Sequence, residues 1–373
     1  MSEFPSHWTN CLLGERIRFE YGKSPNEVRS SDGKYPMYGS SGKSALANNY
    51  TTESPAIIVG RKGTIDKPIF LQERCWAIDT TFFIDNFPSD EPRYLYYLLD
   101  SINLKSLNES TGVPSLSRDA LHSIPVSLPP LPEQKKIAEI LSGIDRCICE
   151  QQNKIDIVAA ILENVSSQIL DNISGDPATH HKRIDEVSIL KGGNGFPIEH
   201  QGVTHGGTPF IKVSDFNNPG NENEIKTANN YLSEESMSSL RPHVFPVNTI
   251  VFAKVGAALT SNRRRLLSTP TCIDNNLMGA IPKGVEPLYL KLLLEKIDFN
   301  EFCQDGAVPS VNQSQIGCIK VPIPSTEKQI KAVLAVESFR ATRKTLEAKR
   351  DKFLTLKNAL ASDLLSGRKR VSI

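Results

Sequence analysis

The chain has 373 residues, of which 39% are hydrophobic and 23% charged, and its net charge at pH 7 is +1. This length suits two or more domains that each bury a core, and the composition argues against a disordered chain. No apolar run approaches the roughly 18 residues that span a membrane, and the N-terminus shows no secretory leader, so we expect a cytoplasmic protein. The seven cysteines are scattered without a CxxC spacing, which argues against a metal site.

Residues 1–130 are predicted to form a first globular domain of mixed α/β character (α+β class). Short β-rich runs such as 56–59 and 76–83 alternate there with turn clusters such as 38–42. One helix interrupts them, beginning at Pro92 and reaching about Leu99.

A long amphipathic helix is predicted over residues 131–175. Pro132 suits the first helical turn, and Glu133 complements the positive end of the helix dipole. Apolar residues then recur at steps of four and three, a period that is typical of a coiled-coil seam. The seam residues of this helix are Ile137, Leu141, Ile144, Ile148, Ile155, Val158, Leu162, Val165 and Ile169.

The same organisation follows in the second half. We expect a polar linker over 176–182, a second globular domain over 183–324, a second long helix over 325–367 and a tail over 368–373. The second helix has an apolar residue every seven positions, at Phe339, Leu346, Phe353 and Leu360. Arg343, Arg350 and Lys357 recur at the same interval. They are expected to pair with a docked partner or with acidic residues of the first helix such as Asp145, Asp156 and Glu163, and contact with DNA along the helices is the alternative.

The chain contains an internal repeat. The segment that begins Glu91-Pro92 and ends Leu98-Leu99 returns 195 residues later as a segment that begins Glu286-Pro287 and ends Leu293-Leu294. Because the helices are duplicated with the globules, the second helix must run antiparallel to the first if the two pair. The sequence therefore predicts a pseudo-two-fold molecule in which an antiparallel coiled coil, about 60 Å long, separates two similar domains.

The junction between domain and helix resembles a known family. Residues 112–121, Gly-Val-Pro-Ser-Leu-Ser-Arg-Asp-Ala-Leu, are followed by Ile-Pro-Val-Ser-Leu-Pro-Pro-Leu-Pro-Glu-Gln-Lys-Lys-Ile-Ala over 124–138. Together with Gly-Arg-Lys-Gly-Thr at 60–64 and Leu-Leu-Ser-Gly-Arg at 364–368, this pattern resembles the DNA specificity subunit of type I restriction-modification enzymes. The resemblance covers essentially the whole chain. The second copy departs at 325–329, where Ser-Thr-Glu-Lys-Gln replaces Pro-Leu-Pro-Glu-Gln.

The resemblance implies a subunit that is not itself an enzyme. Each target recognition domain would read one half of a bipartite, asymmetric site in double-stranded DNA, and the coiled coil would set the gap between the halves. Two DNA methyltransferase subunits would dock on the helices, and motor-nuclease subunits would join them in the full restriction complex. No cofactor is expected in this subunit, while S-adenosylmethionine is expected in the methyltransferase partner.

Arg61, Lys62 and Thr64 follow the β-rich run 56–59 and are the first candidates for DNA contact. Flanking glycines let the backbone approach a phosphate, and the two cations suit phosphates or a guanine edge. Lys254 occupies the corresponding position in the second copy. A solvated basic turn is the alternative interpretation.

Further candidates lie on other expected loops. The densest basic run, Asn262, Arg263, Arg264 and Arg265, is expected to follow phosphates as a loop or to form a solvated surface. Tyr38, Ser40 and Lys43, and in the second copy Lys212, follow matching strands and offer hydrogen-bonding groups, although turn chemistry alone also explains that composition.

Two other functions stay open at this stage. One is a coiled-coil adaptor between proteins, without a role on DNA. The other is a divergent DNA methyltransferase, which the missing Asp/Asn-Pro-Pro-Tyr/Phe tetrapeptide and the missing nucleotide-binding loops disfavour.

Overall fold

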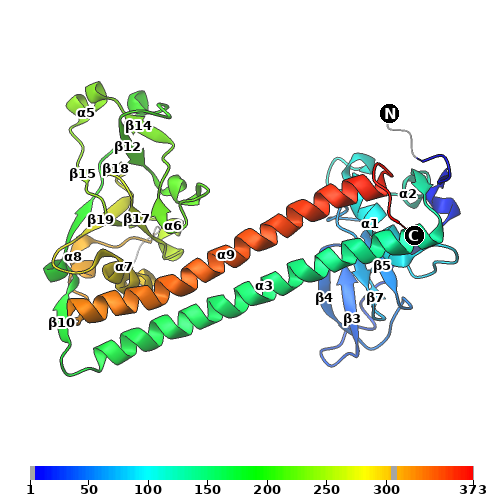
Figure 1. Ribbon diagram of the computed structural model, residues 1–373, viewed down its shortest axis with the longest axis horizontal. Coiled ribbons are helices and arrows are strands. Elements are labelled where there is room, and N and C mark those ends of the chain that lie inside the picture. The colour runs from blue at the N-terminus through cyan, green and yellow to red at the C-terminus, as the bar shows by residue number, and fades with distance from the viewer. Residues whose placement is uncertain (1–4, 304–308, 373) are drawn as a thin grey trace. The chain divides into compact units, whose positions relative to one another are not determined.

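The structure is a computed structural model that describes residues 5–303 and 309–372 (Figure 1). Its contacts divide the chain into two units. Unit 1 comprises Met1–Lys154 and Leu346–Ile373, and unit 2 comprises Ile155–Thr345. The long helices α3 (Leu131–Ser174) and α9 (Thr326–Leu365) each contribute a segment to both units. None of the helices in the described ranges combines the length and the apolar character that a membrane crossing needs.

Unit 1 is built on three small sheets. The central sheet is antiparallel, with the strand order β2-β8-β5-β6. Its strands are β2 (Glu20–Tyr21), β8 (Thr81–Ile84), β5 (Ala56–Gly60) and β6 (Ile69–Leu71). A second sheet has the order β4-β3-β7, formed by β4 (Gly42–Ala47), β3 (Tyr35–Gly39) and β7 (Trp76–Ala77). The third is the pair of β1 (Thr9–Leu12) with β9 (Pro125–Leu128), which leads directly into α3.

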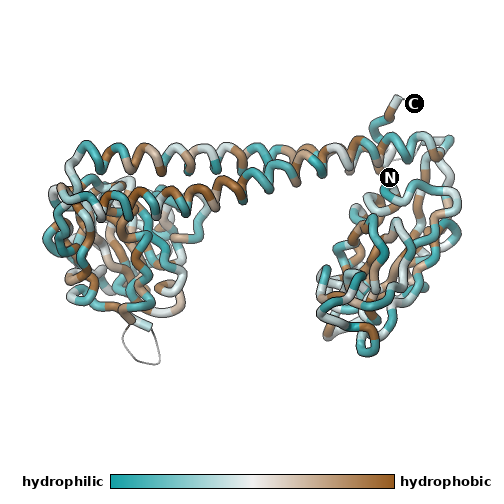
Figure 2. Tube along the Cα trace, turned by 90° about the horizontal axis from the view of Figure 1, so that it is seen from below, coloured by the Kyte–Doolittle hydropathy of each residue, from teal (hydrophilic) through white to brown (hydrophobic). Residues whose placement is uncertain are grey.

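The core of unit 1 lies between the central sheet and its helices. Every residue of β5 is buried, as expected for an apolar central strand, and α1 (Pro92–Ser101) packs Tyr94, Leu95 and Leu98 into the same core. Pro92 at the start of α1 has the fixed φ that a first helical turn needs. Figure 2 shows apolar stretches of the chain inside each unit and along part of the long helices.

Unit 2 repeats this plan with additions. Its main sheet has the order β11-β19-β16-β17-β13, formed by β11 (Ser188–Gly192), β19 (Leu277–Pro282), β16 (Ile250–Ala253), β17 (Arg264–Leu267) and β13 (Glu224–Ile225). A second sheet comprises β14 (Asn230–Leu232), β12 (Thr208–Ile211), β18 (Thr271–Ile273) and β15 (Val244–Phe245). In addition to its segments of α3 and α9, unit 2 contains the α-helices α4 (Ile184–Val187), α5 (Glu234–Leu240), α6 (Ala257–Thr260), α7 (Pro287–Lys296) and α8 (Gln313–Gly317).

The segment expected as a linker over 176–182 is partly a strand. β10 (His180–Arg183) pairs antiparallel with β20 (Lys320–Ile323), as β1 pairs with β9 in unit 1. All four residues of β10 are exposed, so the sequence shows no apolar pattern that would predict a strand here. The strand forms because its main-chain groups pair with those of β20.

The duplication is confirmed in hydrogen-bonding detail. In unit 1, Gln134 is buried, accepts from the backbone N–H of Glu91 at 2.9 Å and donates to the carbonyl of Pro129 at 3.0 Å. In unit 2, Gln329 accepts from the N–H of Glu286 at 2.9 Å and donates to the carbonyl of Pro324 at 2.9 Å. The altered junction at 325–329 therefore keeps the glutamine that fastens the helix start to the preceding domain.

The predicted seam residues lie on the inner face of the helices. Every one of them in both α3 and α9 is buried or half-buried. Within unit 1, Lys357 of α9 forms an ion pair with Asp145 of α3 at 2.8 Å, which confirms the expected pairing at that position. Arg350 instead pairs with its neighbour Asp351 and donates to Gln152 at 2.9 Å.

Gln134→Ala is expected to destabilise unit 1 by about 3 kcal/mol, because the Glu91 N–H and the Pro129 carbonyl would lose their side-chain partner and Asp90 would lose one of its donors. Trp8 and Trp76 are the two tryptophans of the chain and both belong to unit 1, so urea unfolding followed by tryptophan fluorescence reports on this unit. The exposed Gln72 provides the control, and Gln72→Ala should leave the transition unchanged. Equal midpoints for the two variants would contradict the fastening role.

Candidate nucleic-acid interface

A turn fastened to a second loop recurs in both units. In unit 1 the turn after β5 is held by main-chain bonds from Gly63 N–H to the Pro114 carbonyl, at 2.9 Å, and from Leu116 N–H to the Arg61 carbonyl, at 2.9 Å. In unit 2 the turn after β16 is held in the same way, from Gly256 N–H to the Pro309 carbonyl at 2.8 Å. The bond from Val311 N–H to the Lys254 carbonyl, at 3.0 Å, completes the second copy.

The glycine that ends each turn has a backbone that a side chain would strain. Gly63 has φ +88° and Gly256 has φ +77°, and both lie in the region that favours glycine. The residue before this glycine is Lys62 in unit 1 and Val255 in unit 2. Main-chain bonds to the second loop hold the turn on both sides of that residue. The side chain of Lys62 is exposed, so a cation stands at the tip of the first turn.

An exposed tyrosine lies near two arginines beside this turn in unit 1. Tyr21 is 44% exposed, and the guanidinium carbons of Arg61 and Arg118 each lie 5.2 Å from the centre of its ring. Arg61 also donates to the Asp79 carbonyl at 3.1 Å, which holds its side chain against the domain. The buried Nε of Arg118 has no hydrogen-bond partner among the described residues. This group of residues, Tyr21, Arg61, Lys62 and Arg118, is called the tyrosine–arginine cluster below.

Tyr21 and Arg118 were missed by the sequence reasoning. Arg118 opens α2 (Arg118–His122) and lies in the motif that carried the family resemblance, so that motif contained a usable signal. Tyr21 lies on β2, and only the pairing of β2 with β8 brings it beside the turn. A short strand such as β2 gives too little pattern for its neighbours to be read from sequence.

The other candidates of unit 1 lie on the β3–β4 hairpin and at the end of the turn. A methyl group placed on Gly63 would lie 3.1 Å from the Ser40 hydroxyl, so the hairpin turn meets the Gly63 turn. Thr64 is half-buried. Lys43, expected in a loop, lies on β4 with its side chain exposed. Tyr38 is half-buried against the apolar cluster of Ile58 and Leu71, and burial raises the pKa of its hydroxyl.

The cations of unit 2 are differently engaged. Lys254 points toward Gly192, and a methyl group on that glycine would lie 3.0 Å from the Lys254 ammonium. Lys212 donates to Gln201 and lies over the Phe196 ring at 5.2 Å. Arg263 is exposed and donates to Asn217. Unit 2 therefore offers separate cations, with glycine where unit 1 has Tyr21.

The run 262–265 is not the loop that the sequence suggested. Arg264 opens β17 and is only 2% exposed, because its guanidinium lies 3.8 Å from the Phe299 ring centre and donates to the Leu294 carbonyl at 3.1 Å. Burial lowers its pKa to about 9. Asn262 accepts from Arg264 at 2.6 Å and donates to the Ile297 carbonyl at 3.0 Å. Arg265 is half-buried over Phe216. Of these four residues, Arg263 alone has an exposed side chain.

Arg264→Ala is expected to destabilise unit 2 by about 3 kcal/mol, because Asn262 and the Leu294 carbonyl would lose their partner and the ring of Phe299 its packing. Hydrogen exchange of β16 and β17 amides measures this loss within unit 2. Arg263→Ala is the matched neighbour and should leave exchange unchanged. If the two variants exchange alike, the core role of Arg264 is wrong.

Within the described ranges, no group of three or more His, Cys, Asp or Glu side chains is placed to hold a metal ion. The described interface features are therefore cations, hydroxyl groups, a tyrosine ring and main-chain amides. Such groups bind phosphates and base edges.

Comparison with known proteins finds one family that matches both halves of the chain. The family described as Type I restriction modification DNA specificity domain matches twice, over residues 5–158 and 180–355. The chain is similar to the type I restriction enzyme EcoDI specificity subunit of Escherichia coli, with 20% identity over 98% of this chain and 88% of the relative. It is 28% identical to the MjaVIII specificity subunit of Methanocaldococcus jannaschii over 41% of this chain and 40% of the relative.

Two solved structures share the fold. The S subunit of a type I restriction-modification system from M. genitalium superposes with a TM-score of 0.67 at 16% identity, covering 100% of this chain and 98% of that one. A chain from a study of complex assembly and conformational transition in the type I system gives a TM-score of 0.59 at 14% identity, covering 99% of this chain and all of that one.

Proposed function

Because the chain belongs to the type I restriction-modification DNA specificity family, in two copies of its domain, we propose a division of labour between the two units. The chain is a specificity subunit. Unit 1 reads one half of a bipartite DNA site and unit 2 reads the other. The helices α3 and α9 set the gap between the half-sites and carry the methyltransferase subunits.

The observation that carries this proposal is the fastened turn, which is the same in both units while its side chains differ. Unit 1 places the tyrosine–arginine cluster at its turn, whereas unit 2 has Lys254 and Val255 there and Gly192 where unit 1 has Tyr21. Two domains that recognise different half-sites can share the backbone of this turn but need different side chains on it. Lys62 and Lys254 suit phosphate contacts, and the exposed part of the Tyr21 side chain suits packing in a groove.

Exposed apolar residues on the long helices support a docked protein. Within unit 2, Ile157 and Ile161 stand one turn apart on α3, and Ile330 and Leu334 stand one turn apart on α9. All four side chains are at least 40% exposed, although each helix also buries its seam. We assign these pairs to methyltransferase subunits, which would hold S-adenosylmethionine, with motor-nuclease subunits joining in the restriction complex.

Methylation mapping tests the function. The chain is expressed with its methyltransferase subunit, and methylated adenines are located by single-molecule sequencing of the host DNA. We expect one asymmetric, two-part motif with a fixed unspecified gap. A stable complex with an active methyltransferase that produces no new methylation would favour a protein adaptor instead. S-adenosylmethionine binding by the chain alone would favour a divergent methyltransferase.

A further inference from the structure

The strand β6 forms an open edge of the central sheet in unit 1. β6 pairs with β5 on one side, and no described residue pairs with its other side. An unpaired strand edge offers main-chain donors and acceptors to any extended segment that reaches it. Proteins commonly cover such edges, so the open edge of β6 is a candidate docking site.

Unit 2 covers the corresponding edge with its own chain. β6 and β17 are equivalent, because Phe70 pairs with Ile57 of β5 as Leu266 pairs with Ile250 of β16. In unit 2 the strand β13 runs parallel to β17 on the outer side, with Glu224 opposite Leu266 and Ile225 opposite Leu267. The Leu266 N–H donates to the Asn223 carbonyl at 3.0 Å, so the amide at this position points outward. By the same register, the outward amide of β6 is that of Phe70.

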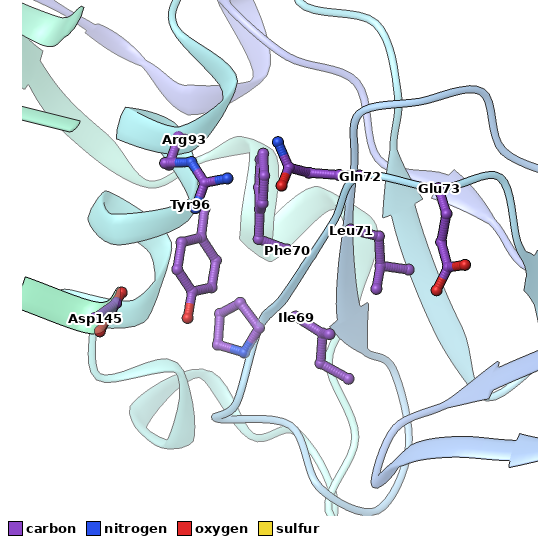
Figure 3. Close-up of a pocket in the computed structure, with 9 residues that line it drawn as sticks. Ile69, Phe70, Leu71, Gln72, Glu73, Arg93, Tyr96 and Asp145 are labelled. Atoms are coloured by element: carbon purple, nitrogen blue, oxygen red, sulfur yellow. The ribbon is translucent and has the colours of Figure 1, made fainter. Parts of the chain in front are cut away.

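A pocket of about 530 Å³ opens along the β6 edge. Figure 3 shows the ring of Phe70 beside Tyr96 and Arg93, with Ile69 and Leu71 pointing away from them. The Arg93 guanidinium lies 4.4 Å from the Phe70 ring centre, and the Phe70 and Tyr96 rings are 5.8 Å apart. Asp145, on α3, closes the pocket on the helix side.

We infer that the β6 edge binds an extended segment of the methyltransferase subunit, which adds a strand parallel to β6 as β13 does in unit 2. This inference rests on the proposed function. The segment accepts a hydrogen bond from Phe70 N–H. By analogy with Ile225, which lies opposite Leu267 in unit 2, an aliphatic residue stands opposite Leu71.

A peptide fits this edge better than DNA does. The carboxylates of Glu73 and Asp145 border the pocket and repel phosphates, and the Arg93 charge already lies against the Phe70 ring. A second copy of this chain would have to pair its own β6 edge with the β6 edge of the first copy, since a two-fold dimer joins the same surface of both copies. The methyltransferase is favoured because Asp145, which borders the pocket in unit 1, lies on α3, the same helix whose Ile157 and Ile161 are assigned to its docking in unit 2.

The test uses the full chain with its methyltransferase subunit. Hydrogen exchange is measured on the chain alone and in the complex, and we expect the outward amide of Phe70 to exchange at least about tenfold more slowly in the complex. The amides of β2, at the opposite edge of the same sheet, should not change. A complex whose β6 exchange is unaltered overturns this inference and leaves the proposed function standing, whereas failure to form a complex overturns both.

Two substitutions at one position isolate the main-chain bond. Phe70→Ala and Phe70→Pro both remove the ring, but only the proline removes the outward N–H, and proline is tolerated at an edge strand. We expect Phe70→Pro to bind the methyltransferase about tenfold more weakly than Phe70→Ala. Equal affinities overturn strand addition. Protection of β6 by DNA alone, or by raising the concentration of the chain alone, would assign the edge to DNA or to a second copy instead.

Discussion

A chain with seven residues added to each long helix is expected to recognise the same two half-sites across a longer gap. Seven residues are two helical turns, so each insert lengthens its helix by about 10 Å and nearly restores the facing of the seam. On B-DNA that length corresponds to at most about three base pairs. Methylation mapping reads the gap directly, because both half-sites appear in every modified sequence.

The unit boundaries show where the inserts belong. One is placed after Lys154 in α3 and the other before Leu346 in α9, so that the contacts inside each unit are kept. These contacts include the ion pair of Lys357 with Asp145 in unit 1 and the packing of Leu170 and Val333 in unit 2. The control carries the insert in α3 only, which places the two seams out of register and should abolish recognition. An unchanged gap in the double insert would contradict the spacer role.

The long helices were predicted to within two residues at each end because their signals are local. α3 spans Leu131–Ser174 against the expected 131–175, and α9 spans Thr326–Leu365 against 325–367. An apolar period held over many turns survives any error in a single residue. The duplication could also be recognised from the sequence. Gln134 and Gln329 make the same buried hydrogen bonds in their two units, so both copies need the same side chain at this position.

The interface was less predictable because it depends on contacts distant in sequence. Arg264 and Arg263 are neighbours, yet one is buried against Phe299 and the other is exposed, and the difference follows from the strand β17. A basic run reads as a surface loop unless the pairing of its strand is known. In the same way Tyr21, on β2, meets Arg118 only through the fold.

The double variant Arg61→Ala, Lys62→Ala is expected to weaken DNA binding by the complex and to relax recognition in one half-site. Lys62 is the exposed cation at the tip of the first turn, and its loss should reduce the salt dependence of binding by about one unit of slope. Arg61 is held against Tyr21 and the Asp79 carbonyl, so its removal also frees the ring that it orders. Binding isotherms over a range of salt concentrations measure the slope, and methylation mapping measures the specificity.

Variants of single lysines show whether this effect belongs to the turn. Lys254→Ala changes the equivalent turn of unit 2 and should relax recognition of the other half-site only. Lys67→Ala removes an exposed cation of unit 1 outside the turn and should leave both half-sites intact. A loss of net charge would weaken recognition of both half-sites alike, whereas the loss of a turn that contacts one half-site would relax recognition of that half-site only. Relaxation of both half-sites by the Arg61 and Lys62 double variant would therefore refute the assignment of one unit to one half-site, and unchanged affinity with unchanged salt slope would remove the turn from the interface.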